Sequence, residues 1–191
     1  MTIGGGLAGA TLAWQLMMAA MMAPTAYPWL RAAGRLAPTP ARFAALEFGA
    51  GYFVSWLPFS LALAVAQLAL RGGWAHAAGW QGGLLLAAGL YQFAPLKRAC
   101  LRHCRDPLSF LLRSWPGGGR SLLALGARHG LFCLGCCWAL MATALAAGMA
   151  NLLWMAALAV AAFGEQTLAR GAWLRAALGL ALIATGGVRL G

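Results

Sequence analysis

The chain has 191 residues, of which 62% are hydrophobic and only 9% are charged. Soluble domains have roughly 45–50% apolar and about 25% charged residues, so this composition excludes an ordinary soluble domain. The net charge of +11 does not indicate a nucleic-acid partner, because the basic residues lie between hydrophobic runs, where such residues orient membrane proteins and contact anionic lipid. We therefore expect a single integral membrane domain over residues 1–191.

A transmembrane helix requires about 20 predominantly apolar residues. By this criterion the sequence predicts six spans, at about residues 7–29, 48–70, 80–96, 129–148, 150–164 and 173–190. Prolines interrupt helical hydrogen bonding, so we expect the first span to end near Pro24 and Pro28 and the second to kink at Pro58. The predicted fold class is all-α, a polytopic membrane bundle of about six transmembrane helices.

The basic residues predict an orientation for this bundle. Cytoplasmic connections carry an excess of Lys and Arg. In the six-span arrangement, every basic residue except Arg71 and Arg189 falls in the first, third or fifth connection. We therefore expect these connections to be cytoplasmic and both termini to lie on the other side.

One cysteine group directly follows the third predicted span. Cys100 and Cys104 are one helical turn apart and His103 lies between them, so all three side chains can project from one side of a helix. This group falls on the predicted cytoplasmic side, where thiols stay reduced and remain available as metal ligands.

A second cysteine group begins the fourth predicted span, at a similar predicted depth. It belongs to a helical stripe of one imidazole, three thiols and one thioether, formed by His129, Cys133, Cys136, Cys137 and Met141. Thiolate and thioether ligands select soft ions rather than Mg²⁺ or Ca²⁺. Thiols combined with thioethers favour Cu(I), whereas cysteine with histidine alone would equally suit zinc.

The first predicted span adds methionines in two pairs one turn apart, namely Met17 with Met21 and Met18 with Met22. These residues also have a purely structural interpretation, because methionine is common filler in membrane helices and free cysteine often packs as a small hydrophobe. Metal ligation and simple packing therefore both remain open for the methionines and the cysteines.

Residue patterns typical of enzymes are missing. The chain has only three acidic residues, and we find no paired carboxylates, phosphate loop or Ser/His/Asp arrangement. Glu165 lies near a span end, where Lys97 or Arg170 can pair with it. We expect no enzymatic activity.

Three segments carry a family resemblance. They are residues 17–24 (Met-Met-Ala-Ala-Met-Met-Ala-Pro), residues 91–97 (Tyr-Gln-Phe-Ala-Pro-Leu-Lys) and residues 135–138 (Gly-Cys-Cys-Trp). With them, the chain resembles an uncharacterised bacterial family of predicted metal-binding integral membrane proteins over most of residues 12–166. In one departure from that family, Gln166 follows Glu165 where a basic residue is typical. The resemblance implies a multi-pass protein of the bacterial inner (cytoplasmic) membrane.

We therefore expect a soft-metal-binding membrane protein for metal handling or delivery, with copper as Cu(I) expected first and zinc as the alternative. The first-choice ligands are the five cysteines, followed by His129, Met141 and the four methionines of the first span. The expected partners are membrane lipid, other membrane protein subunits and a metalloenzyme, with no nucleic acid. A structural or accessory subunit of a larger membrane complex is the alternative function, because the small size and the Gly- and Ala-rich faces fit it well.

Overall fold

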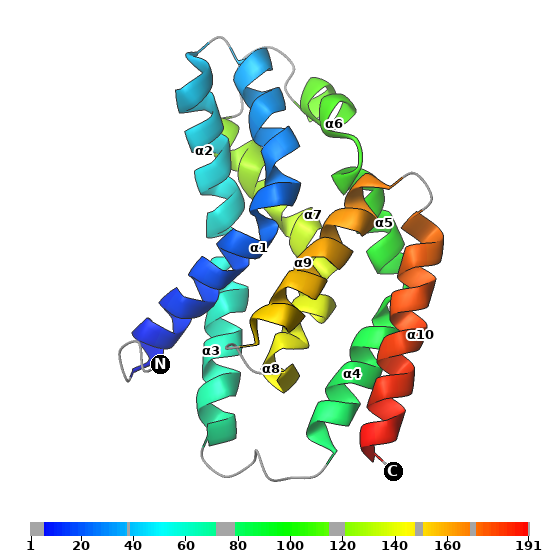
Figure 1. Cartoon of the computed structure of the whole chain (residues 1–191). Helices are drawn as coiled ribbons and strands as arrows, with labels where there is room; N and C mark the ends of the chain where they lie inside the picture. The colour runs from blue at the N-terminus through cyan, green and yellow to red at the C-terminus, as the bar shows by residue number, and fades with distance from the viewer. Residues whose placement is uncertain are drawn as a thin grey trace.

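The computed structural model describes residues 6–37, 39–71, 79–114, 121–147, 151–168 and 171–190. Within these ranges the chain forms helices and no strand, which confirms the all-α prediction (Figure 1). In chain order the helices are α1 (Leu7–Leu36), α2 (Ala41–Val54), α3 (Leu57–Arg71), α4 (Trp80–Tyr91), α5 (Pro95–Cys104), α6 (Pro107–Ser114), α7 (Leu122–Ala142), α8 (Ala144–Ala147), α9 (Leu152–Thr167) and α10 (Gly171–Leu190).

Four described segments are long and apolar enough to cross a membrane, namely Leu7–Leu36, Ala41–Leu70, Leu122–Ala147 and Gly171–Leu190. Helix α9 is apolar but has only 16 residues, and α4 has 12. The expected count of about six spans is therefore not confirmed. The predicted turn between the fourth and fifth spans falls at 148–150, outside the described residues.

Prolines shape the helices differently from the sequence expectation. The predicted end of the first span at Pro24 and Pro28 is not observed, because α1 continues through both residues to Leu36 and bends instead (Figure 1). Its contacts with both α2 and α3 hold the two halves in place, so the lost hydrogen bonds produce a bend rather than an end. Between α2 and α3 the helix is interrupted ahead of Pro58, which has no N–H to donate to the carbonyl of Val54.

The predicted third span is divided in the structure. Helix α4 ends at Tyr91, and α5 begins with Pro95 after Ala94 in an extended conformation. The residue before a proline avoids the helical conformation, and proline itself is well placed in the first helical turn. This break makes α5 a separate helix, and α5 contacts both α7 and α9.

Glycines allow α2 and α7 to pack closely. A Cβ atom added to Gly126 would overlap the carbonyl oxygen of Phe48, and one added to Gly51 would overlap the carbonyl oxygen of Leu123. Small residues permit this close backbone approach between helices. As a result, Tyr52 of α2 reaches Cys133 of α7 in the core.

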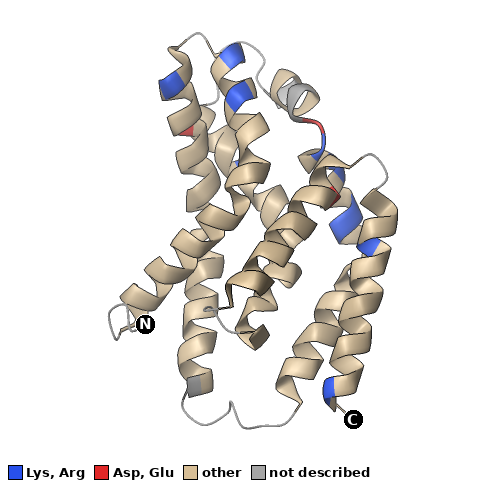
Figure 2. Cartoon of the chain, viewed as in Figure 1, with Lys and Arg blue, Asp and Glu red and all other residues tan. Residues whose placement is uncertain are grey.

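Charged residues are distributed unevenly over the bundle. Figure 2 shows that Lys and Arg gather toward the end that carries the α1–α2 connection and α5. Arg189 lies in the last turn of α10, at the opposite end, while the side chain of Arg71 lies outside the described part. The asymmetry agrees with the sequence pattern, and the orientation in a membrane stays a prediction.

Candidate metal centre

Three buried thiols from two helices meet in the core. Cys104 is the last residue of α5, and Cys133 and Cys136 lie one turn apart on α7. Their sulfur atoms all lie within 4.8 Å of one another, and those of Cys104 and Cys136 are 3.9 Å apart. Metal–sulfur bonds of about 2.3 Å place three ligands of a trigonal ion about 4 Å apart. The three residues, called the thiol triad below, therefore have the spacing of a three-coordinate soft-metal site.

Cys137 supplies a fourth thiol beside the triad. It is buried on α7, and its sulfur lies 3.2 Å from that of Cys136. The Cys136 thiol in turn donates to the carbonyl oxygen of Cys133 at 3.1 Å. Cys133, Cys136 and Cys137 are spaced i, i+3 and i+4 on α7, and the fourth thiol, Cys104, comes from α5.

Cys100 lies outside the triad although it is one turn from Cys104. Its side chain is half-buried, and its sulfur lies over Gly135, where an added Cβ would be only 2.7 Å away. Burial raises the pKa of the Cys100 thiol, which favours the neutral form. The structure therefore separates two residues that the sequence grouped together.

His129 is one turn before Cys133 but belongs to an aromatic cluster. Its ring stacks on Trp29 with centroids 3.5 Å apart, and it also lies near the rings of Phe48, Tyr52 and Phe110. Its Nδ1 has no hydrogen-bond partner among the described residues. This predicted ligand is thus placed beside the site rather than in the triad.

The predicted methionine ligands share a hydrophobic cluster with the thiols. The members are buried Met18, Met21, Met22 and Met141, and Met17 packs against the cluster from a partly buried position. The same cluster contains Cys133, Cys136 and Cys137. The structure brings these residues into one core, and their role as ligands remains a prediction.

Two polar residues that the sequence did not identify as part of the site, Tyr52 and Gln166, contact the thiols. The hydroxyl oxygen of Tyr52 lies 3.1 Å from the Cys133 sulfur. The side-chain amide of Gln166 donates to the sulfurs of Cys137 and Cys133, at 3.4 and 3.7 Å. A glutamine directly after a buried acid in an apolar helix was the available signal for the second contact.

A buried ion pair includes Glu165, the residue that precedes Gln166. The ammonium of Lys97 on α5 is 2.7 Å from a carboxylate oxygen of Glu165 on α9, and the side chains are 1% and 0% exposed. Arg105 follows Cys104 and donates to the main-chain carbonyl of Glu165 from Nε and Nη2, at 3.1 and 2.7 Å. Of the two partners predicted for Glu165, the structure shows Lys97, and Arg170 lies outside the described residues.

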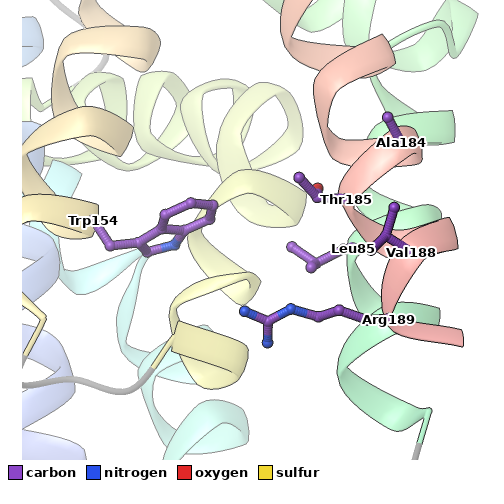
Figure 3. Close-up of a pocket in the computed structure, with 6 residues that line it drawn as sticks. All are labelled: Leu85, Trp154, Ala184, Thr185, Val188 and Arg189. Atoms are coloured by element: carbon purple, nitrogen blue, oxygen red, sulfur yellow. The ribbon is translucent and has the colours of Figure 1, made fainter.

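A pocket of about 330 Å³ lies elsewhere in the molecule. Its lining residues are Leu85, Trp154, Ala184, Thr185, Val188 and Arg189. Figure 3 shows the Arg189 side chain extending toward the Trp154 ring. None of the described lining residues is a cysteine, histidine or methionine, so the candidate metal centre is the packed cluster of side chains rather than this cavity.

A helical bundle with reduced thiols grouped in its core defines a protein suited to a soft metal ion such as copper. The chain belongs to the copper chaperone family PpoB2, whose family model matches residues 11–189. No curated protein and no solved structure matches the chain. Family membership supports the metal-handling class that the sequence resemblance implied, and the Gly-Cys-Cys-Trp motif as a family signature stays a prediction.

Proposed function

We propose that this chain is a membrane-embedded carrier of Cu(I) that holds the ion at the thiol triad and passes it on by ligand exchange. The observation that supports this most directly is the convergence of the Cys104, Cys133 and Cys136 sulfurs within 4.8 Å. Sulfur ligands prefer Cu(I) among the common soft ions in a low-coordinate site. The family description as a copper chaperone points to the same ion.

Zinc is the less suitable ion for this arrangement. Structural zinc sites in proteins almost always have four protein ligands, whereas the sulfurs that lie within 4.8 Å of one another are those of Cys104, Cys133 and Cys136 alone among the described residues. The nearest imidazole on α7 is stacked in the aromatic cluster. A three-thiol site therefore favours Cu(I), which accepts fewer ligands than zinc.

Delivery would proceed through thiols that adjoin the triad. Cys137 lies beside Cys136, and the half-buried Cys100 precedes Cys104 by one turn of α5. An ion can move between such sulfurs by forming one bond before another breaks. The proposed acceptor is a metalloenzyme, and the chain itself acts as a carrier rather than an enzyme.

We place this activity in the bacterial inner membrane. The four long apolar helices support a multi-pass arrangement, and the end rich in Lys and Arg (Figure 2) would face the cytoplasm and its anionic lipid. We propose other membrane protein subunits as partners, and we do not propose a nucleic-acid partner. Resistance of the protein to extraction from membranes by alkaline carbonate would test this placement, and release into the soluble fraction would contradict it.

Anaerobic Cu(I) titration of the purified protein against a chromophoric chelator tests the proposed function. We expect the wild type to retain Cu(I), and Cys104→Ser, Cys133→Ser and Cys136→Ser each to lose it. Cys100→Ser is the matched control, because this cysteine shares α5 with Cys104 but lies outside the triad, and we expect it to retain Cu(I). A wild type that binds no Cu(I), or binds only Zn(II), would overturn the proposal.

A further inference from the structure

Gln166 is a buried amide directed at sulfur atoms. Its side chain is only 6% exposed. The nitrogen Nε2 lies 3.4 Å from the Cys137 sulfur, 3.7 Å from that of Cys133 and 4.0 Å from that of Cys136. Every cysteine of α7 is therefore within reach of this one donor group, which α9 supplies from the neighbouring helix.

The position of Gln166 is fixed independently of the sulfurs. Its neighbour Glu165 is held by Lys97 of α5 through the ion pair and by Arg105, the residue that follows α5, through two hydrogen bonds to the main-chain carbonyl. Since α5 also ends with Cys104, one set of contacts locates both the α5 ligand and the α9 amide. The carboxamide thus points at the thiols because the α5–α9 contacts hold its backbone there.

The chemistry of an amide suits this position. A carboxamide NH₂ group has two donor hydrogens and keeps them at all ordinary pH values. Cysteine binds metal as the thiolate, and a buried negative charge is costly unless hydrogen bonds compensate it. Hydrogen bonds to a charged acceptor are roughly twice as strong as those between neutral groups. Two N–H donors beside the thiolates therefore stabilise the form of the site that holds the ion.

We propose that Gln166 is a positioning residue for the metal, which donates N–H···S hydrogen bonds to the triad thiolates of Cys133 and Cys136 while the ion is bound. This inference rests on the proposed Cu(I) binding. In this proposal, α5 and α7 supply the sulfur ligands, and α9 supplies the hydrogen-bond donor that stabilises their thiolate form. Groups that surround the direct ligands of a metal typically change its affinity 10–100-fold when they are replaced.

Three variants separate this role from simple packing. Gln166→Leu removes both donors, and Gln166→Glu keeps the shape while it replaces the amide with a carboxylate. Gln92→Leu is the matched control, because Gln92 is a buried glutamine whose amide nitrogen and oxygen have no hydrogen-bond partner among the described residues. The readouts are Cu(I) affinity by chelator competition and the thiolate-to-metal charge-transfer band of the Cd(II)-loaded protein.

We expect Gln166→Leu to lower Cu(I) affinity by about 10–100-fold and to move the charge-transfer band to longer wavelength, because sulfur without N–H donors is more electron-rich. Gln166→Glu should lose at least as much affinity, since its carboxylate repels the thiolates. Gln92→Leu should match the wild type in both readouts. An unshifted band in Gln166→Leu, with or without weaker binding, would overturn the positioning role. Failure of the wild type to bind Cu(I) would instead overturn the proposed function beneath it.

Discussion

Lys97 and Glu165 form an ion pair of 2.7 Å in which neither side chain reaches solvent. The pair joins α5, the helix that ends with Cys104, to α9 at the residue before Gln166. A charge buried in this way depends on its partner, since breaking a buried pair leaves an uncompensated charge. Replacing only one of the two residues should therefore lower the stability of the protein.

Lys97→Met should destabilise the protein by about 3–5 kcal/mol, because it leaves the Glu165 carboxylate buried without a cation. The double variant Lys97→Met/Glu165→Leu should recover much of this loss, since neither charge is then present. Thermal unfolding in detergent measures both effects. Equal stability of the single variant and the wild type would show that the pair has no such role.

Gly126→Ala should destabilise the α2–α7 contact by about 1–3 kcal/mol, as overpacking in a tight core does. The added Cβ meets the main-chain carbonyl oxygen of Phe48, which cannot move unless the helices separate. Gly83→Ala is the control, because no atom of the described residues lies within 4 Å of its Cβ position in α4. Alanine there should be neutral or stabilising by roughly 0.5–1 kcal/mol. Similar unfolding midpoints for the two variants would contradict the close approach seen at Gly126.

Cys100 should be the first cysteine of the folded protein to react with iodoacetamide, because it is half-buried and the other four are buried. Its raised pKa keeps the thiol protonated at neutral pH, so the reaction should be slow at pH 7. The rate should still be rising above the ordinary thiol pKa of about 8.5. Mass spectrometry of labelled peptides measures the order, and Cys100→Ser should remove the early product. Earlier labelling of Cys133 or Cys136 would contradict the burial pattern.

Cu(I) loading should raise the unfolding midpoint, and removal by a strong chelator should lower it again. A ligand present at 100 times its Kd stabilises the folded state by about 2.7 kcal/mol. Cys136→Ser should show no such copper-dependent shift, whereas Cys100→Ser should keep it. A shift of equal size in Cys136→Ser would mean that the ion binds away from the triad.

Periodicity and hydropathy were sufficient to predict the all-α class. They also predicted that Cys104 lies at a similar depth to Cys133 and Cys136, whose sulfurs the structure places within 4.8 Å of its own. The predicted depth of each cysteine depended only on how far it lay from a hydrophobic run. The span count was less predictable. Hydropathy does not detect the helix break before Pro95, where the proline favours an extended conformation of Ala94. The composition across residues 80–96 is continuous although the helix is not.

The sequence could not separate Cys100 from Cys104, because both lie on the same side of one helical turn. The rotation of α5 against α7 decides which sulfur joins the triad, and the absence of a side chain at Gly135 leaves room for the other. His129 was similarly ambiguous, since Trp29, which stacks on its ring, and Phe110, which meets it edge-on, come from helices distant in the sequence. Side-chain contacts of this kind depend on tertiary packing rather than on local spacing.

The thiol triad takes its members from two helices that are separated along the chain by α6. An ion held by Cys104, Cys133 and Cys136 would close this part of the chain into a loop, and such a cross-link lowers the conformational entropy of the unfolded protein. Copper-free chains would then unfold more readily than loaded ones, and proteases preferentially remove chains that unfold. The lifetime of the protein in the cell would therefore increase with the supply of copper.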